Sequence, residues 1–414
     1  MFPFTKPFVR VSKMKFHVRT LALFSFIIFL NLALRIIQNR ETEQQKQNSI
    51  QNFSTYLWQN RTFVTTINHF SSKNRLYFTR NIFDNFSGEI KSTIGQKIIL
   101  FFNEPEYMRK LGKKDAVYKD CEYKNCIISH DKNKLSIANA VIFYIGIRNE
   151  RMGKEPPINM KQRNPNQAWI FTTVEPPEHF YNADYRSKFW HNTMNWSSLY
   201  MLDSDIPNPY GCLVRTKELT SSDYDSVYNS KTRNALWMVS HCEVASARRR
   251  YVIEMTKNGF DVDILGGCGT DGRKVSMQEF AQIVPTYKFL LAFENSFCND
   301  YISEKFFHHY NSSWIIVVRG GANYNRLLPY KTYINTADFS KVSTLVDFLS
   351  NLANDKDKYI EFLRNKDRYV SIRWPGNRNC EICRRLNNLS NYVKSYTTLD
   401  QYLTVNQCFQ PSDS

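Results

Sequence analysis

Three side chains that could bind a nucleotide diphosphate follow a short apolar run in the second half of the chain. Tyr301, Glu304 and Lys305 belong to the stretch FENSFCNDYISEK, which begins where the run KFLLAF ends. A lysine can bind phosphate, a carboxylate can accept hydrogen bonds from ribose hydroxyls, and a tyrosine can stack or hydrogen-bond. If Asp300 caps a helix that runs to about Tyr310, the three side chains share one face of its first turns, beside free N–H groups that favour an anion. An ordinary capped helix with a solvated charge pair fits the same residues equally well.

The apolar runs around this stretch predict the sheet that must position it. KFLLAF and WIIVVR are expected to be consecutive parallel strands, and ligands bind outside the carboxyl ends of such strands. The interval 181–234 is expected to be irregular. Two successive blocks of strand and helix predict an α/β protein with two mainly parallel sheets. The other expected strands are 97–102, 139–145, 167–174, 234–240 and 260–267, and the expected helices are 246–259 (ended by Gly259), 344–355 and 358–370.

The N-terminal region predicts a membrane anchor. The run LALFSFIIFLNLAL, from Leu21 to Leu34, follows five Lys or Arg residues and no Asp or Glu. It is shorter than the roughly 20 apolar residues that span a bilayer, so the predicted anchor, residues 19–37, includes its flanks. The positive-inside bias places residues 1–18 in the cytoplasm and the remainder on the lumenal side. A cleaved signal peptide is the alternative, but no small-x-small cleavage site follows the run.

The sequence after the anchor fits a lumenal protein. Residues 38–65 are rich in Gln and Asn and poor in apolar side chains, as expected of a flexible stem. The formal net charge of +17 favours an anionic partner. Six N-glycosylation sequons behind an anchor make nuclear or cytosolic nucleic-acid binding a poor fit. They lie at Asn52, Asn60, Asn85, Asn195, Asn311 and Asn388.

Nine cysteines fit an oxidising compartment, in which disulfides persist. Cys121 with Cys126, and Cys380 with Cys383, form two close pairs. Four thiolates could hold zinc, but these spacings are irregular for a zinc site. We expect the first pair to bridge to the second and so tie the N-terminal domain to the C-terminal tail; a bridge within the CxxC of Cys380 and Cys383 is the alternative. Because the count is odd, at least one cysteine is free or pairs with another chain.

Several segments of the chain resemble one enzyme family. FENSFCNDYISEKFF closely resembles the donor-binding signature of the α1,3/α1,4-fucosyltransferases, which reads FENS…DY(V/I)TEK. Pro176 replaces a usual serine, and Met201 and Leu202 stand where two arginines are usual. Other segments resemble the family in the same order, over roughly residues 137 to 385: NQAWIFTTVEPPEHF, NTMNWSSLYMLDSDIPNPYG, WMVSHCEVASARRRYVIEM, GGANYNRLLP and CEICRR. By this resemblance the chain is identified as a member of the family.

The resemblance implies a GT-B type architecture with two Rossmann-like domains. An acceptor-side domain is expected at 66–225, a GDP-fucose-binding domain at 226–375 and a tail with the CxxC at 376–414. The family implies GDP-L-fucose as donor, the 3-hydroxyl of a GlcNAc as acceptor, inversion at the anomeric carbon, and a lumenal body on the Golgi membrane. Three acceptor classes present that hydroxyl: Lewis-type N-acetyllactosamine, the chitobiose core of an N-glycan, and terminal GalNAc-GlcNAc units.

Single residues carry the chemistry that the resemblance implies. Glu175 falls on the family's proposed general base, which must lie within ~3 Å of the acceptor oxygen to take its proton. Glu178, three residues further on, is the alternative base. In a purely structural interpretation Glu175 would be an ordinary loop carboxylate, and Arg248 and Lys305 would be exposed helix charges. Cations must neutralise the charge on the departing diphosphate, so Arg248 and Lys305 would make a metal unnecessary, with Mn²⁺ or Mg²⁺ at most stimulatory. The donor-binding positions are Arg248, Asn295, Tyr301, Glu304 and Lys305.

Asp203 and Asp205 look like the DxD site of GT-A glycosyltransferases, in which two carboxylates hold Mn²⁺ on a nucleotide diphosphate. In this chain the pair lies far in sequence from FENSFCNDYISEK, and we interpret it as structural. A metal-dependent GT-A transferase that uses this pair is one alternative function. An inactive, membrane-anchored glycan-binding relative is another, although the presence of Glu175 and Lys305 argues against it.

Overall fold

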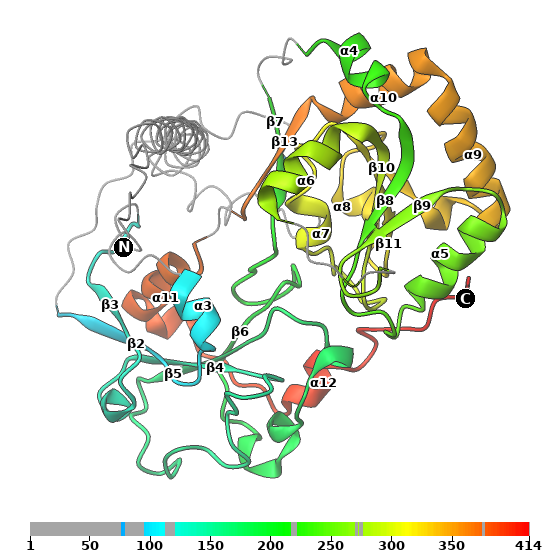
Figure 1. Ribbon diagram of the computed structural model, residues 1–414. Coiled ribbons are helices and arrows are strands. Elements are labelled where there is room, and N and C mark those ends of the chain that lie inside the picture. The colour runs from blue at the N-terminus through cyan, green and yellow to red at the C-terminus, as the bar shows by residue number, and fades with distance from the viewer. Residues whose placement is uncertain are drawn as a thin grey trace, which may run out of the picture. The chain divides into compact units, whose positions relative to one another are not determined.

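The computed structural model of the chain describes residues 76–78, 95–111, 121–216, 222–269, 272, 276–374 and 377–413 (Figure 1). The predicted anchor and stem lie outside these residues, as do the sequons at Asn52, Asn60 and Asn85. Within the described segments, no helix has both the length and the apolar character that crossing a membrane requires.

The first sheet has five parallel strands in the order β3-β2-β4-β5-β6. β4 and β5 are buried throughout, as expected of parallel strands covered on both faces. Phe143 packs against Trp169 and Trp190, with ring centroids 5.1 and 5.3 Å apart. Three of the strands confirm expected ones, whereas β3 and β6 were not expected. The strands are β2 (Lys97–Phe101), β3 (Cys126–Ser129), β4 (Ala140–Tyr144), β5 (Ala168–Thr172) and β6 (Trp196–Ser198).

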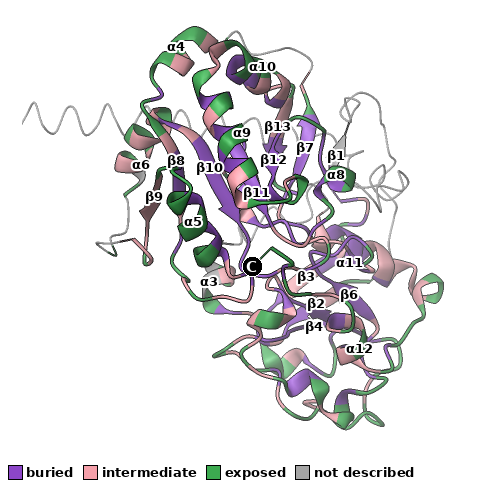
Figure 2. Cartoon of the chain, turned by 90° about the vertical axis from the view of Figure 1, so that its right-hand side faces the viewer, coloured by how far each residue is buried: buried purple, intermediate pink, exposed green. Residues whose placement is uncertain are grey.

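The second sheet also has five parallel strands, in the order β12-β11-β10-β8-β9. All four strands expected in this part of the chain are present, and Figure 2 shows β8 and β10 buried. Three helices cover one face and bury Tyr251, Leu345 and Leu349 against it. Gly259 follows the first of them with a positive φ of 84°, as expected at a helix end. The elements are β8 (Arg233–Met238), β9 (Val262–Leu265), β10 (Tyr287–Phe293), β11 (Ile315–Arg319), β12 (Ile334–Asn335), α5 (Arg248–Lys257), α9 (Val342–Asn354) and α10 (Lys356–Lys366).

The other face of this sheet packs against short helices and a small third sheet. In that sheet β7 (Cys212–Arg215) lies between β1 (Tyr77–Phe78), which is parallel to it, and β13 (Tyr369–Ile372), which is antiparallel. The helix expected at 358–370 is therefore wrong at its end, because β13 pairs with a strand far away in sequence. The interval 181–234 is likewise less irregular than expected. The helices on this face are α6 (Met277–Ile283), α7 (Glu304–Phe307) and α8 (Tyr324–Leu327). The short helix α4 (Tyr224–Asn229) packs on the opposite face, where Tyr228 contacts Tyr359 of α10.

The C-terminal segment returns to the first sheet. There α11 (Arg378–Asn387) packs Ile382 and Leu386 into one apolar cluster with residues of strands β2 and β4. Helix α3 (Glu106–Leu111) follows β2 in the chain. A short helix, α12 (Leu399–Leu403), follows. Short 3-10 turns join these elements, at Lys132–Lys134, Pro177–His179, Asp184–Arg186, Lys188–Trp190, Val284–Thr286, Thr336–Asp338 and Leu389–Tyr392.

Two disulfides attach this C-terminal segment to the N-terminal part of the chain. Cys121 bonds Cys380 and Cys126 bonds Cys383, which confirms the expected bridging of the two pairs and leaves no thiolates there for zinc. Cys212 is the free cysteine that the odd count requires, and it is buried. The two remaining disulfides are Cys242–Cys268 and Cys298–Cys408.

Candidate active site

The loop that follows β10 is built around a buried carboxylate. Glu294 is 1% exposed and accepts hydrogen bonds from the backbone N–H and the hydroxyl of Ser303, each at 2.8 Å. The Nζ atom of Lys305 lies 3.2 Å from the same carboxylate. Burial raises the pKa of Glu294, and the charge of Lys305 opposes that rise. Residues 294–303, which we name the β10–α7 loop, therefore close around Glu294.

The helix expected from Asp300 to Tyr310 is shorter and begins later. α7 spans Glu304–Phe307, and its N-cap is Ser303, whose hydroxyl accepts from the backbone of the first turn. Asp300 has a positive φ of 57°. Its carboxylate accepts a hydrogen bond from the backbone N–H of Leu202 at 3.2 Å instead of capping a helix. The expected cap is wrong because a distant segment supplies the donor for Asp300.

Tyr301 lies before the helix, so it does not share a helical face with Lys305, and this expectation is wrong. Its side chain is 1% exposed. Its ring packs against Tyr200 and Tyr210, with centroids 5.0 and 6.1 Å apart. The hydroxyl of Tyr210 donates to the carbonyl of Val174 at 2.5 Å. This tyrosine cluster therefore joins the β10–α7 loop to the segment that leaves β5.

Lys305 keeps a charged, partly exposed ammonium group. Its side chain is 24% exposed, and Nζ donates to the Ser303 hydroxyl at 2.8 Å. The carboxylate of Glu304 lies 3.3 Å away. Burial would lower the pKa of Lys305, but the carboxylates of Glu294 and Glu304 outweigh that effect and raise it. A fixed cation of this kind can neutralise a phosphate.

Arg248 is buried rather than exposed on its helix. It begins α5 at 3% exposure and donates to the carbonyl of Phe293 at 2.7 Å and to that of His241 at 2.8 Å. Burial lowers the pKa of Arg248, while the charges of Glu294 and Glu304 oppose that change. The guanidinium thus fastens the carboxyl end of β10 to the segment after β8.

Glu175 brings a carboxylate from the first sheet to this loop. It lies just beyond β5, where its backbone N–H donates to the hydroxyl of Thr173 at 3.2 Å. Burial raises the pKa of Glu175; the charge of Lys305 and a hydrogen bond with the Asn295 side chain oppose the rise, while Glu304 adds to it. Glu175, Asn295 and Lys305 are therefore neighbours although they come from different sheets. Among the residues that the structure describes, the Oδ1 atom of Asn295 is buried without a hydrogen-bond partner.

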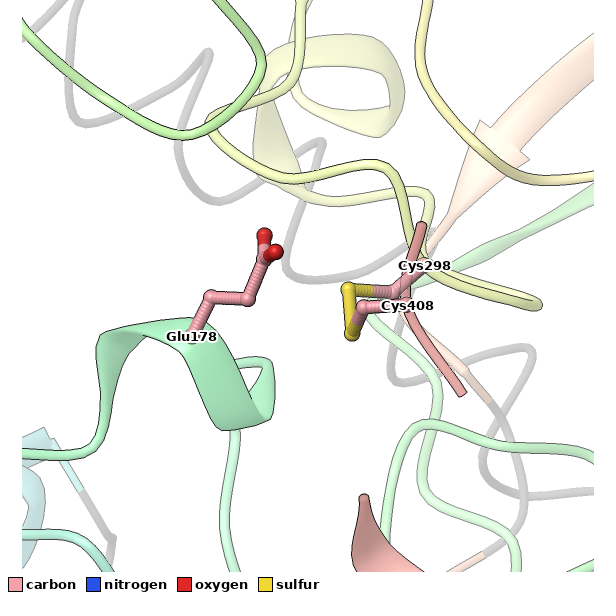
Figure 3. Close-up of side chains that lie close together, drawn as sticks. All are labelled: Glu178, Cys298 and Cys408. Atoms are coloured by element: carbon pink, nitrogen blue, oxygen red, sulfur yellow. A yellow bond between two sulfur atoms is a disulfide. The ribbon is translucent and has the colours of Figure 1, made fainter. Parts of the chain in front are cut away.

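Glu178 lies beside the disulfide Cys298–Cys408, as Figure 3 shows. It is exposed, and its carboxylate lies within 4.8 Å of the sulfurs of Cys298 and Cys408. Within the described part of the chain this is the one group of three His, Cys, Asp or Glu side chains spaced to hold a metal. Its two sulfurs are bonded to each other and cannot act as thiolate ligands. The geometry therefore favours Glu175 over Glu178 as the candidate base.

The carboxylate of Asp205 is occupied by structural hydrogen bonds. Its Oδ2 atom accepts from the backbone and hydroxyl of Ser197, at 2.9 and 3.1 Å, and from the hydroxyl of Tyr396 at 2.6 Å. Its Oδ1 atom accepts from Lys394 at 2.9 Å. Asp203 accepts separately from Tyr402 at 3.1 Å. These contacts support the structural interpretation of the DSD segment.

Two residues of the site escaped the sequence reasoning. Glu294 directly follows β10, and His179 follows Glu175 in the same segment. Burial lowers the pKa of His179, and the charges of His241 and Arg248 act in the same direction. The rule that ligands bind at the carboxyl ends of parallel strands could have identified Glu294, because the loop after β10 was already of interest.

The three described sequons use their amides inside the fold. Asn195 donates to the carbonyl of Lys394 at 2.8 Å, and Asn311 donates to that of Ser371 at 2.9 Å. Asn388 donates both to the carbonyl of Arg384 at 2.8 Å and to the hydroxyl of Tyr123 at 3.0 Å. Each asparagine side chain therefore donates inside the fold, and Asn388 uses both hydrogens of its amide nitrogen.

Comparisons with known proteins identify the family of the chain. The chain matches the family model described as glycosyltransferase family 10 (fucosyltransferase) C-term over residues 228–402, and that described as fucosyltransferase, N-terminal over residues 95–211. Alpha-(1,3)-fucosyltransferase C of Drosophila melanogaster is 31% identical over 295 residues, which cover 65% of this chain and 66% of that protein. A 3-galactosyl-N-acetylglucosaminide 4-alpha-L-fucosyltransferase of Homo sapiens is 30% identical over 274 residues, which cover 65% and 72%.

A crystal structure of an alpha1,3-fucosyltransferase with GDP-fucose is also similar, with a TM-score of 0.46 and 17% identity over 68% of this chain and 84% of that one. Two findings establish the family. The chain is 30% identical to the human relative over more than two thirds of that protein's length, and the two family models match the two halves of the described body. The chain is thus a glycosyltransferase of the α1,3-fucosyltransferase type and belongs to glycosyltransferase family 10, the fucosyltransferases.

Proposed function

We propose that this chain transfers L-fucose from GDP-β-L-fucose to the 3-hydroxyl of a GlcNAc in a glycoprotein glycan, with inversion at the anomeric carbon. One observation carries the proposal: the contacts of Tyr210 with Val174 and Tyr301 join the segment of Glu175 to the β10–α7 loop, so the charge of Lys305 acts on the Glu175 carboxylate. Direct displacement needs a base for the acceptor and a cation for the departing diphosphate. Here the two groups meet between segments that leave different sheets.

In the proposed step the acceptor oxygen attacks fucose C1 while the bond from C1 to the β-phosphate oxygen breaks. Glu175 takes the acceptor proton as the new bond forms, and its raised pKa makes it a stronger base than an exposed glutamate. GDP leaves with the negative charge, which the ammonium of Lys305 stabilises. Because Lys305 is held by Glu294 and Ser303, its position does not depend on the ligand.

The other donor-binding candidates divide into contacts and supports. Asn295 and Glu304 have polar atoms beside Glu175 and Lys305, which supports a direct role with the donor. Arg248 and Tyr301 are 3% and 1% exposed, so we assign them to shaping the loop on which the donor rests. The fixed cation Lys305 performs the neutralising role in this proposal, and Mn²⁺ or Mg²⁺ would at most stimulate transfer.

The names of relatives support the acceptor class. Glycoprotein 3-alpha-L-fucosyltransferase A of Drosophila melanogaster is 29% identical over 333 residues, which cover 76% of this chain and 61% of that protein. The charge pattern around LALFSFIIFLNLAL supports a single-pass type II anchor. We therefore place the enzyme on the Golgi membrane with its catalytic body in the lumen.

A transfer assay with the full-length chain tests this function. The donor is GDP-fucose, and the acceptors are N-acetyllactosamine, a chitobiose-core glycopeptide and a GalNAc-GlcNAc disaccharide. We expect α-linked fucose on the GlcNAc 3-hydroxyl of at least one acceptor, with transfer surviving EDTA. Failure with all three acceptors, or a β-linked product, would overturn the proposal. Complete and metal-reversible loss in EDTA would favour the metal-dependent alternative.

A further inference from the structure

The last described residues of the chain dock on the β10–α7 loop. Residues 406–413, which we name the C-terminal clasp, follow α12 and bond covalently to the loop through the disulfide Cys298–Cys408. These two residues form a short antiparallel bridge. Next to them the backbone N–H of Phe409 donates to the carbonyl of Phe297 at 2.9 Å, and their rings lie 5.9 Å apart. The clasp therefore holds the loop by covalent, backbone and ring contacts together.

An ion pair between a buried arginine and an exposed carboxylate fixes the end of the clasp. Arg319, at the end of β11, has a side chain that is 0% exposed and lies 2.6 Å from the carboxylate of Asp413. Its guanidinium packs over the rings of Tyr251 and Phe297, 4.5 and 4.7 Å from their centroids. A buried guanidinium without a carboxylate partner is costly. Asp413 of the clasp thus neutralises a cation that the second sheet buries.

Hydrogen bonds continue from this ion pair to the candidate active site. Arg319 also donates to the carbonyl of Ser246 at 2.6 Å. The backbone N–H of Ser246 donates to the carbonyl of Asn295 at 3.1 Å, and its hydroxyl donates to that of Glu294 at 2.7 Å. Tyr301 of the loop packs against Tyr210, whose hydroxyl donates to the carbonyl of Val174, the residue before Glu175. The clasp is therefore connected through Arg319 and Ser246 to the backbone of the two residues that begin the loop.

We propose that the C-terminal clasp is a positioning element for donor binding. Its two positioning features are the Cys298–Cys408 disulfide and the carboxylate of Asp413, which hold the β10–α7 loop beside the segment that carries Glu175. The inference rests on the proposed function, because it assigns the loop to the donor. A loop without a regular hydrogen-bond ladder loses conformational entropy when it is ordered by a ligand, so holding it beforehand strengthens binding.

Two variants of the full-length chain test the clasp. Cys298→Ser combined with Cys408→Ser removes the covalent link, and Asp413→Asn removes the charge while keeping the shape. We expect the Kd for GDP and the KM for GDP-fucose to rise about tenfold to a hundredfold, with a smaller change in kcat. Amide hydrogen exchange in residues 294–303 should become faster in both variants.

Matched controls separate positioning from general stability. Cys121→Ser with Cys380→Ser removes a disulfide at the first sheet, and Asp400→Asn removes an exposed carboxylate on α12 that lies 2.8 Å from Arg186. Both should leave GDP affinity and exchange in the loop unchanged. The inference is overturned if both clasp variants bind GDP like wild type, or if the control disulfide variant loses as much GDP affinity.

Two further outcomes remain decisive. If the double cysteine variant does not fold, Asp413→Asn alone decides. If the wild-type chain neither binds GDP nor transfers fucose, the proposed function fails, and the exchange of residues 294–303 still shows whether the clasp holds the loop.

Discussion

Glu175 and Asp205 are both carboxylates in segments that follow strands of the first sheet, yet their surroundings differ. Asp205 accepts four hydrogen bonds, from Ser197, Tyr396 and Lys394, which use both of its oxygens. Glu175 interacts with a single amide and with the charge of Lys305, a residue of the other sheet. One carboxylate is therefore part of the packing of the first sheet, and the other is directed to a neighbouring segment.

The same difference appears in the direction of their pKa shifts. Burial alone would raise the pKa of Asp205, but hydrogen bonds from Tyr396, Ser197 and Lys394 hold it below its ordinary value. Burial raises the pKa of Glu175, and its fewer partners do not reverse that. A general base gains from a raised pKa, whereas a structural carboxylate is stabilised in its ionised form. The comparison teaches that the role of a carboxylate is indicated by its hydrogen-bond and charge partners, and not by the sequence motif in which it occurs.

The largest expected effect comes from replacing the proposed base. Glu175→Gln keeps the shape of the side chain but cannot accept the acceptor proton. We expect the variant to fold, to bind GDP like wild type and to transfer fucose at least ~10²-fold more slowly. Steady-state kinetics and GDP titration measure both quantities.

Glu178→Gln is the matched control, because Glu178 is exposed beside the Cys298–Cys408 disulfide and should be dispensable for proton transfer. If the two variants exchange phenotypes, Glu178 is the base and the comparison above has been drawn with the wrong glutamate. If neither loses activity, the base is a different residue.

A smaller effect is expected when the ammonium group of Lys305 is removed. Lys305→Met should weaken GDP binding about tenfold to a hundredfold, because a hydrogen bond to a charged group contributes about 1.5–3 kcal/mol. Lys394→Met is the control, since it removes a lysine that lies 2.9 Å from Asp205 instead. GDP titration of both folded variants makes the comparison. Equal GDP affinities would show that Lys305 has no role with the diphosphate.

The pH dependence of transfer should reflect the raised pKa of Glu175. The base must be ionised, so kcat/KM should fall as pH falls through a value above the ordinary 4.5 of glutamate, about tenfold per pH unit below it. Burial would lower the pKa of Lys305, but the carboxylates of Glu294 and Glu304 outweigh burial and raise it. Lys305 therefore stays charged across this range. This fall of kcat/KM at low pH should be absent from the residual activity of Glu175→Gln. Full activity at pH 4.5 would contradict the assignment.

Much of the fold follows from the sequence because buried parallel strands leave continuous apolar runs. KFLLAF, AWIFT and their equivalents are covered on both faces, and their positions were predicted closely. β7 and β13 were missed because each is short and its pairing partner is remote in the chain. The helix expected at Asp300 failed for a related reason: its carboxylate bonds the backbone of Leu202, which no local pattern encodes.

The sequence likewise predicted some features of the candidate site and missed others. The residue types at Glu175 and Lys305 were visible in the sequence, but their proximity depends on how segments from two sheets meet. The burial of Arg248 and Tyr301 could not be predicted, because both follow helix-like polar patterns and become buried only through contacts with other elements. The clasp was invisible for the same reason, since Cys298 and Cys408 are separated by 110 residues.

The smallest expected effect comes from replacing Asp205, the structural carboxylate of the comparison. Asp205→Asn should lower the free energy of unfolding by about 1.5–3 kcal/mol, because it weakens charge-assisted hydrogen bonds in a largely buried setting. Since the folded-state pKa of Asp205 is depressed, this stabilisation is present above its ordinary pKa and is lost as pH falls through the folded value. Asp203→Asn should cost less, because Asp203 is exposed and accepts one bond, from Tyr402. Denaturant unfolding measures both, and turnover should stay near wild type in each. If both variants instead lose activity equally and keep their stability, the pair binds a metal and the structural interpretation of Asp205 is wrong.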